Sequence, residues 1–222
     1  MSIFGRYRGP QDLPQRIPVF PLAGALLLPR ADLPLNIFEP RYLAMIEHAL
    51  ANDRLIGIIQ PAAGEEVGNA PSLMKVGCVG RITSWAETPD DRMLITLTGV
   101  ARFQIVDELD AGTPFRQVIA NYHPFAADLA MGAGAAEVNR PALLKVFRDY
   151  LDANNMSADW QEVDQAPTEV LVNTLSLLAP YPPQEKQALL EAPDLKTRAD
   201  VLVALTEVAL SKMGRGAKPR LQ

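Results

Sequence analysis

The strongest constraint on the fold lies in residues 17–42, IPVFPLAGALLLPRADLPLNIFEPRY, an apolar stretch interrupted by prolines. The five prolines are Pro18, Pro21, Pro29, Pro34 and Pro40. Each one removes a backbone hydrogen-bond donor and restricts the residue before it, so a long helix is excluded. The apolar residues between the prolines must still be buried. We therefore expect short extended segments with bends, laid into the core of a β-rich domain.

The remainder of the first half is also rich in strand signals. Alternating and β-branched runs predict strands or extended pieces over residues 16–20, 26–28, 35–38, 55–60, 75–85, 93–106 and 115–122, with a loop over 61–73. Gly99 is expected to bend the run 93–106 into two strands, and Gly77 and Gly80 to mark a bulge or a close backbone approach. Pro40 suits the first position of a helix over residues 40–51, and Glu39 is placed to meet the free N–H groups there.

After residue 125 the apolar residues follow helical spacing instead. Helices are expected over residues 141–153, 159–164, from Thr168 (as N-cap) to 178, 182–190 and 195–213. This segregation of strands and helices indicates an α+β protein with two subdomains. We assign residues 1–15 to a flexible N-terminal arm, 16–125 to a β-barrel subdomain, 126–213 to an α-helical subdomain and 214–222 to a basic, disordered tail.

Charge and composition exclude several classes of protein. The formal net charge of −5 gives little electrostatic support to nucleic-acid binding. Cys78 is the single cysteine, so an internal disulfide is impossible, and its place in a predicted strand indicates a buried thiol. The N-terminus lacks the apolar core of a signal peptide, and no apolar run is long enough for a transmembrane helix. A cytoplasmic protein with no membrane partner is expected.

No motif for a metal, a nucleotide or a covalent catalyst is evident. His48 and His123, the two histidines, have no carboxylate or cysteine at a metal-ligand spacing. The segment 132–137, GAGAAE, lacks the third glycine of a dinucleotide fingerprint, and no phosphate-binding loop or Gly-x-Ser-x-Gly elbow exists. We therefore predict no cofactor.

Several segments together resemble one family, the amino-terminal substrate-binding domain of Lon ATP-dependent proteases. They are Pro18–Leu22, Pro29, Leu33–Leu35, Ile37–Tyr42, Gly77–Ile82, Asp91–Phe103, Glu185–Glu191 and Arg198. The similarity covers residues 15–212 and is greatest to small bacterial proteins that consist of this domain alone. It implies a PUA-like β-pseudobarrel with one helix, followed by a helical bundle. Because the sequence ends at Gln222 without a phosphate loop, we expect it to lack the ATPase and Ser–Lys protease domains and not to be an enzyme.

The resemblance implies a non-catalytic binding module for peptides or exposed hydrophobic segments of proteins in quality control, with a separate protease or chaperone as a further partner. The groove between barrel and helices is the expected site. Its candidate contacts are Phe38, Tyr42, Trp85 and Phe103, and its candidate polar anchors are Glu39, Arg41 and Arg102. Each aromatic residue also fits a place in the core, and Glu39 and Arg41 also fit a structural role at the helix start.

Two alternative functions remain open at the level of the sequence. One is an enzyme with a site in the same groove that uses Glu39, Arg41 or Arg102. The other is RNA binding by analogy with PUA-like barrels, which the acidic balance disfavours. A compact pocket with two or more buried ionisable groups would favour the enzyme, and a strongly basic face would favour RNA binding.

Overall fold

The proline-rich stretch folds as two strands and one helix: β1 (Arg16–Pro21), β2 (Asp32–Ile37) and α1 (Pro40–Ala51). The computed structural model describes residues 5–67 and 70–216. Between the two strands, Leu26, Leu27 and Leu28 are at most 3% exposed but form no strand. The expectation of short, buried, extended segments is confirmed, because the prolines divide the path while the leucines enter the core.

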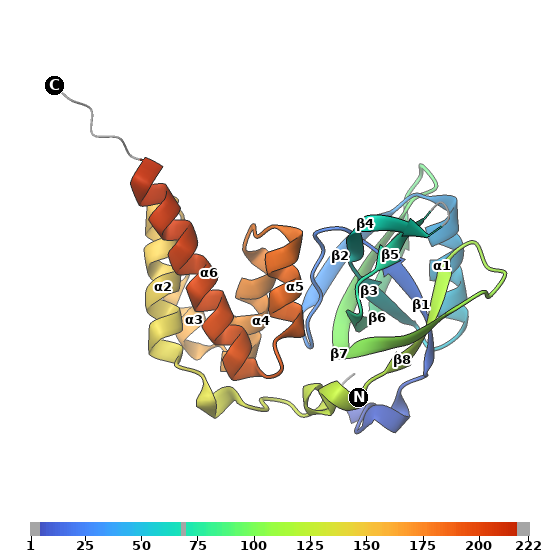
Figure 1. Cartoon of the computed structure of the whole chain (residues 1–222), viewed down its shortest axis with the longest axis horizontal. Coiled ribbons are helices and arrows are strands. Elements are labelled where there is room, and N and C mark those ends of the chain that lie inside the picture. Colours follow the sequence, from blue (N-terminus) through green and yellow to red (C-terminus); the bar gives the residue numbers. More distant parts are fainter. Residues whose placement is uncertain (1–4, 68–69, 217–222) are drawn as a thin grey trace.

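The strands form a closed barrel (Figure 1). The other members of its sheet are β3 (Leu55–Ile59), β6 (Val76–Glu87), β7 (Met93–Leu109) and β8 (Arg116–Asn121). The sheet order is β2-β7-β6-β3-β1-β8, and β7 pairs with β8 as well, which closes the ring. Only β1 and β3 pair in parallel; the other pairs in this sheet are antiparallel. The predicted loop over 61–73 is wrong, because β4 (Pro61–Val67) and β5 (Ala70–Leu73) form a separate hairpin.

One aromatic ring fills much of the barrel interior. Phe103 has no exposed surface, and a Cβ added at Gly57 or Gly77 would lie 2.9 Å or 2.7 Å from its Cζ atom. The expected close approach at Gly77 is thus confirmed, since any side chain there would collide with the ring. Cys78 is also fully buried, and this burial raises the pKa of its thiol, so the group is held neutral and inert.

β7 is a single long strand, contrary to the prediction that Gly99 divides it. The register between β6 and β7 shifts beside Gly80 and Gly99, so the strand is irregular there but continuous. Gly99 accepts a hydrogen bond from the Arg30 N–H (2.8 Å) and donates to the Ala31 carbonyl (2.9 Å). A Cβ at Gly99 would lie 2.0 Å from the carbonyl oxygen of Leu28. Glycine is therefore required by a close backbone approach.

The N-terminal segment packs on the barrel, although we expected a flexible arm over residues 1–15. Tyr7 and Leu13 are each 4% exposed and belong to the barrel core. Arg81 donates to the Tyr7 hydroxyl (3.0 Å), and the Tyr122 hydroxyl donates to the Pro14 carbonyl (3.0 Å). The segment is mostly polar and contains glycine and proline, so its composition did not indicate that Tyr7 and Leu13 would be buried. Residues 1–4 lie outside the described part of the chain.

The second half consists of helices, as predicted. They are α2 (Arg140–Ala153), α3 (Trp160–Gln165), α4 (Thr168–Leu178), α5 (Pro183–Glu191) and α6 (Leu195–Gly216). Thr168 is the first residue of α4 and not its cap, because Pro167 occupies the cap position. Of the predicted tail, residues 214–216 continue α6 and residues 217–222 lie outside the described residues. Within the described ranges, no helix is long and apolar enough to cross a membrane.

Buried charged groups join the two halves. Arg102 on β7 is 2% exposed and donates through Nε (2.9 Å) and Nη2 (2.8 Å) to the two carboxylate oxygens of Asp128. Its Nη1 donates to the carbonyls of Leu190 and Ala192 at the end of α5. Asp128 lies in the linker between barrel and helices, which follows one edge of both halves in Figure 1. One guanidinium thus binds barrel, linker and bundle together.

Further polar contacts continue this network along the interface. Arg30 donates to the backbone carbonyl of Asp128 (2.8 Å) and pairs with the carboxylate of Glu169, on α4. Asn173 donates to the Pro29 carbonyl (3.0 Å), and Arg198 donates to Asn173 (2.9 Å). Three side chains hydrogen-bond between the barrel and α5. The Gln60 amide donates to the Pro183 carbonyl and to the Gln187 side chain. Lys186 donates to the Gly24 carbonyl, and Gln187 donates to the Val76 carbonyl. The halves are therefore held in one arrangement by directional bonds.

We expect Gly99→Ala to lower the free energy of unfolding by about 3 kcal/mol, because the methyl group must displace the Leu28 carbonyl and break the backbone bonds to residues 30 and 31. Gly112→Ala is the control. Gly112 has a positive φ of +62°, which strains an alanine, but no atom lies within 4 Å of its added Cβ, so a loss of about 1 kcal/mol is expected. Urea denaturation followed by circular dichroism measures both, and equal losses would contradict the close approach.

Arg102→Met should cost about 3–5 kcal/mol of unfolding free energy, because it leaves the Asp128 carboxylate buried without its cation. Arg41→Met, which removes an exposed partner of Glu39, should cost less than about 1 kcal/mol. The double variant Arg102→Met/Asp128→Leu should recover part of the loss, because no unpaired charge remains. Urea titration of the four proteins tests this order, and an Arg102 variant as stable as the Arg41 variant would refute it.

Candidate functional site

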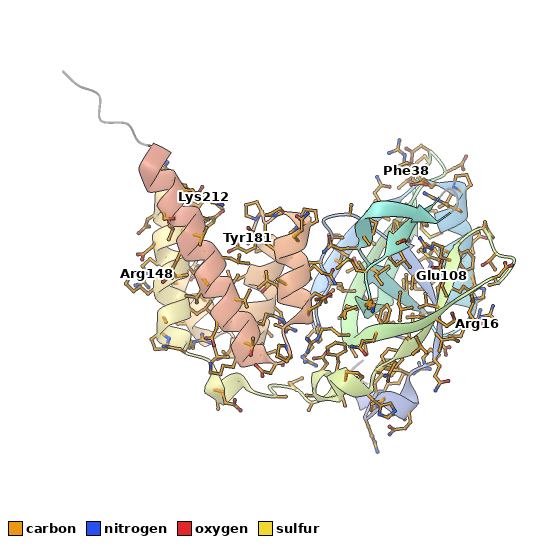
Figure 2. All side chains as sticks on the ribbon, in the orientation of Figure 1. Arg16, Phe38, Glu108, Arg148, Tyr181 and Lys212 are labelled. Carbon is orange, nitrogen blue, oxygen red and sulfur yellow. The ribbon has the colours of Figure 1, made fainter. Side chains whose placement is uncertain are left out.

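The structure does not gather the four predicted aromatic contacts into one groove. Phe103 is removed from the candidates, because it is enclosed in the barrel. Tyr42 is 7% exposed and stacks on Phe20 with ring centroids 4.1 Å apart, and its burial raises its pKa. Phe38 is 61% and Trp85 45% exposed. Figure 2 shows Phe38 on the barrel, away from α2 and α6.

The two exposed aromatic residues are each covered by an arginine. The guanidinium of Arg92 lies 5.7 Å from the ring centroid of Phe38, and that of Arg54 lies 4.8 Å from Trp85. Trp85 also lines a shallow cavity of about 430 Å³ on the outside of β2, β6 and β7. We call it the barrel cavity. Tyr42 and the predicted anchor Arg41 line a smaller cavity of about 240 Å³, together with Phe115 and several prolines.

The predicted polar anchors have structural partners. Glu39 and Arg41 pair with each other at 2.8 Å on the surface, and the Glu39 side chain makes no cap bond to α1, contrary to expectation. Arg102 is a member of the interface network and faces no groove. We expected a groove between barrel and helices, but buried hydrogen bonds lie at that boundary, and one hydrophobic cluster includes residues of both halves, such as Val76 and Leu189.

Sequence reasoning missed the acids and amides that complete this network, above all Asp128, Glu169 and Asn173. A buried arginine within a strand needs a carboxylate, and Asp128 is one of two acids, with Glu137, in a linker rich in small and apolar residues, so a signal was present. Burial, together with the nearby charge of Arg102, lowers the pKa of Arg198 to about 10, which still leaves it charged at neutral pH.

The buried ionisable groups do not favour an enzymatic site. None of Arg30, Arg102, Asp128, Glu169 and Arg198 lines any cavity described here. A polar cavity of about 330 Å³ on the barrel contains Arg16, His48 and Asp53, and all three are exposed. Across the described ranges, no group of three His, Cys, Asp or Glu side chains could hold a metal ion.

A second cavity of about 430 Å³ lies inside the helical bundle, and we call it the helical cavity. Its walls come from α2, α4 and α6 and from the loops 156–158 and 179–181. None of the fifteen residues that line it carries a charge. Tyr181 and Thr206 supply hydroxyl groups that hydrogen-bond to each other at 2.7 Å, and Figure 2 shows Tyr181 beside α6.

Two large apolar side chains at this cavity are open to solvent. Leu178, the last residue of α4, is 75% exposed, and Met156, in the loop before α3, is 56% exposed. Leu143, Phe147 and Tyr150, at helical spacing on α2, also line the cavity. An apolar hollow with exposed apolar side chains at its edge is typical of a binding surface.

The local sequence explains why this hollow is not filled. The loop after α2 turns at Asn155, which has a positive φ of 54°, and α3 is only six residues long. At the other edge, α4 ends at Leu178, and Pro180 and Pro182 prevent the helix from continuing over the cavity. Neither segment is long enough to cover the faces of α2 and α6.

Comparison with known proteins identifies the domain. The model of the ATP-dependent protease La (LON) substrate-binding domain matches residues 16–207. Lon protease 2 of Myxococcus xanthus is 26% identical over 205 residues, which are 88% of this chain and 24% of that protein. Lon protease of Syntrophus aciditrophicus is 23% identical over 218 residues, 95% of this chain and 27% of that protein. The chain thus spans about a quarter of the length of these relatives.

Two solved structures share the fold. A Lon N-terminal domain protein from Xanthomonas campestris has a TM-score of 0.58 at 20% identity and covers 85% of this chain and 97% of its own. The N-terminal domain of Lon protease from Mycobacterium avium complex has a TM-score of 0.58 at 17% identity and covers 86% and 98%. The matched region is the substrate-binding part of these proteases and not a catalytic part. With the family model matching most of its length, this chain belongs to the Lon substrate-binding domain family.

Proposed function

We propose that this chain binds apolar segments of unfolded polypeptides in the helical cavity and so serves substrate recognition in protein quality control. The observation that carries the proposal is an uncharged cavity with Leu178 and Met156 exposed beside it. Its volume of about 430 Å³ lies in the range of ligand sites, roughly 300–1,000 Å³. Unfolded chains expose the apolar side chains that such a surface can shield from water.

The chemistry of the cavity lining favours binding of many different peptide sequences over binding of a single one. Methionine is unbranched and flexible, so Met156 can adapt to side chains of different shape. Tyr150, Tyr181 and Thr206 offer hydroxyl groups that can bond to a peptide backbone without imposing a side-chain charge. The membership of a substrate-binding family supports the same class of ligand, because the substrates of a protease are polypeptides.

The test is the binding of a fluorescently labelled, reduced and carboxymethylated protein, which cannot refold, followed by fluorescence anisotropy. The unfolded form should bind, and the same protein in its native state should not. The variant Met156→Ser/Leu178→Ser should weaken binding about tenfold, because it removes apolar area that the ligand would cover. Both side chains are exposed in the free protein, so its stability should change by less than about 1 kcal/mol.

Leu94→Ser is the matched control. Leu94 is 47% exposed and lines the barrel cavity beside Trp85. The proposal predicts unchanged binding for this variant. If Leu94→Ser weakens binding while Met156→Ser/Leu178→Ser does not, then the barrel cavity is the site and the helical cavity is not. If the unfolded protein binds none of the three proteins, the proposed function is wrong.

A further inference from the structure

The segment that forms most of the helical cavity carries charges of only one sign. Residues 149–185 contain seven acidic residues and no lysine, arginine or histidine. The same segment supplies ten of the fifteen residues that line the cavity. The chain as a whole has 26 acidic and 21 basic side chains, so this stretch is far more one-sided than the average.

Most of these acids are open to solvent. Asp152, Asp159, Glu162 and Asp164 are exposed, whereas Glu169 is buried and paired with Arg30. Asp159 also caps α3. Of the remaining two acids, Asp149 precedes the lining residue Tyr150 in the sequence, and the charge of Glu185 adds to the burial that raises the pKa of the lining residue Tyr181.

The cations closest in sequence to this segment are already engaged. Lys145 pairs with Asp149 at 2.9 Å, and the guanidinium of Arg148 lies 4.2 Å from the ring centroid of Trp160. On the other side, Lys186 donates to the Gly24 carbonyl in the barrel at 2.9 Å. On α6, which carries the lining residue Thr206, both Lys196 and Lys212 are exposed, and Lys196 pairs with Asp200 at 2.6 Å. These contacts leave the cations charged, but residues 140–213 contain eleven acidic and seven basic side chains, so the helical half is net negative.

We propose that the helical cavity selects apolar polypeptide segments that are flanked by lysine or arginine. The inference rests on the proposed function, because it concerns which polypeptides the same cavity accepts. The apolar lining holds the uncharged side chains, and the exposed acids attract the flanking cations and repel flanking carboxylates. Because those acids face water, the preference depends on ionic strength.

Three synthetic peptides test this charge selection on the full chain. They share one apolar core of leucine and phenylalanine and carry two lysines, two serines or two glutamates at each end. At about 0.01 M salt, anisotropy titration should give the order lysine, serine, glutamate, with about tenfold between the first and the last. Near 1 M salt, where the Debye length is about 3 Å, the three dissociation constants should converge.

The variant Asp152→Lys/Glu162→Lys reverses two exposed charges on the cavity segment. It should abolish or invert the order. Glu47→Lys/Asp110→Lys changes the net charge equally on exposed barrel positions and should preserve the order. The comparison separates a local field from the effect of total charge.

Each outcome distinguishes the inference from the proposed function. Equal binding of all three peptides at low salt would overturn the charge selection and leave apolar binding intact. An order that survives Asp152→Lys/Glu162→Lys, or that the barrel variant removes as well, would show that the cavity segment is not its cause. If no peptide and no unfolded protein binds, the proposed function fails first and the inference fails with it.

Discussion

The contact between Arg102 and Asp128 fixes how the two halves of the molecule meet. Both side chains are almost fully buried, so their removal from water is costly and is offset only by near-complete hydrogen bonding. The guanidinium bonds to the linker carboxylate and to the end of α5, and it lies 4.3 Å from the ring centroid of Phe125. Such directional bonds tolerate little sliding. The pair therefore specifies one relative position of barrel and bundle.

In the proposed function, this arrangement determines where an apolar polypeptide can bind. Because buried polar and apolar side chains fill the boundary between the halves, the apolar surface that the proposal uses lies inside the bundle, where short segments leave α2 and α6 uncovered. The barrel, with Phe103 enclosed in it, acts as a rigid support. Under the proposed function, the barrel would fix the geometry and the helices would provide the contact surface for the polypeptide.

Much of the fold could be predicted from the sequence, because proline spacing, strand alternation and helical periodicity act locally. The hairpin β4–β5 was missed because its glycine, proline and alanine content resembles that of a loop. Phe103 and Arg102 show the limit most clearly. They are neighbours on one strand and point to opposite faces, and alternation alone does not tell which face meets the barrel interior and which meets the bundle. The helical cavity was not predicted, because the prolines and the short α3 that leave it open act through tertiary packing, which local patterns do not specify.

The composition of the chain changes at residue 125, but the network of buried polar side chains includes residues on both sides of that boundary. The carboxylate that neutralises Arg102 belongs to Asp128, which lies beyond the last strand, in the linker. A barrel that ended at the change in composition would enclose a cation without its counter-ion. The linker is thus an electrostatic component of the barrel as well as a covalent connection. The part of the chain in which every buried barrel charge has its counter-ion therefore includes the linker, and it is longer than the part that forms the strands.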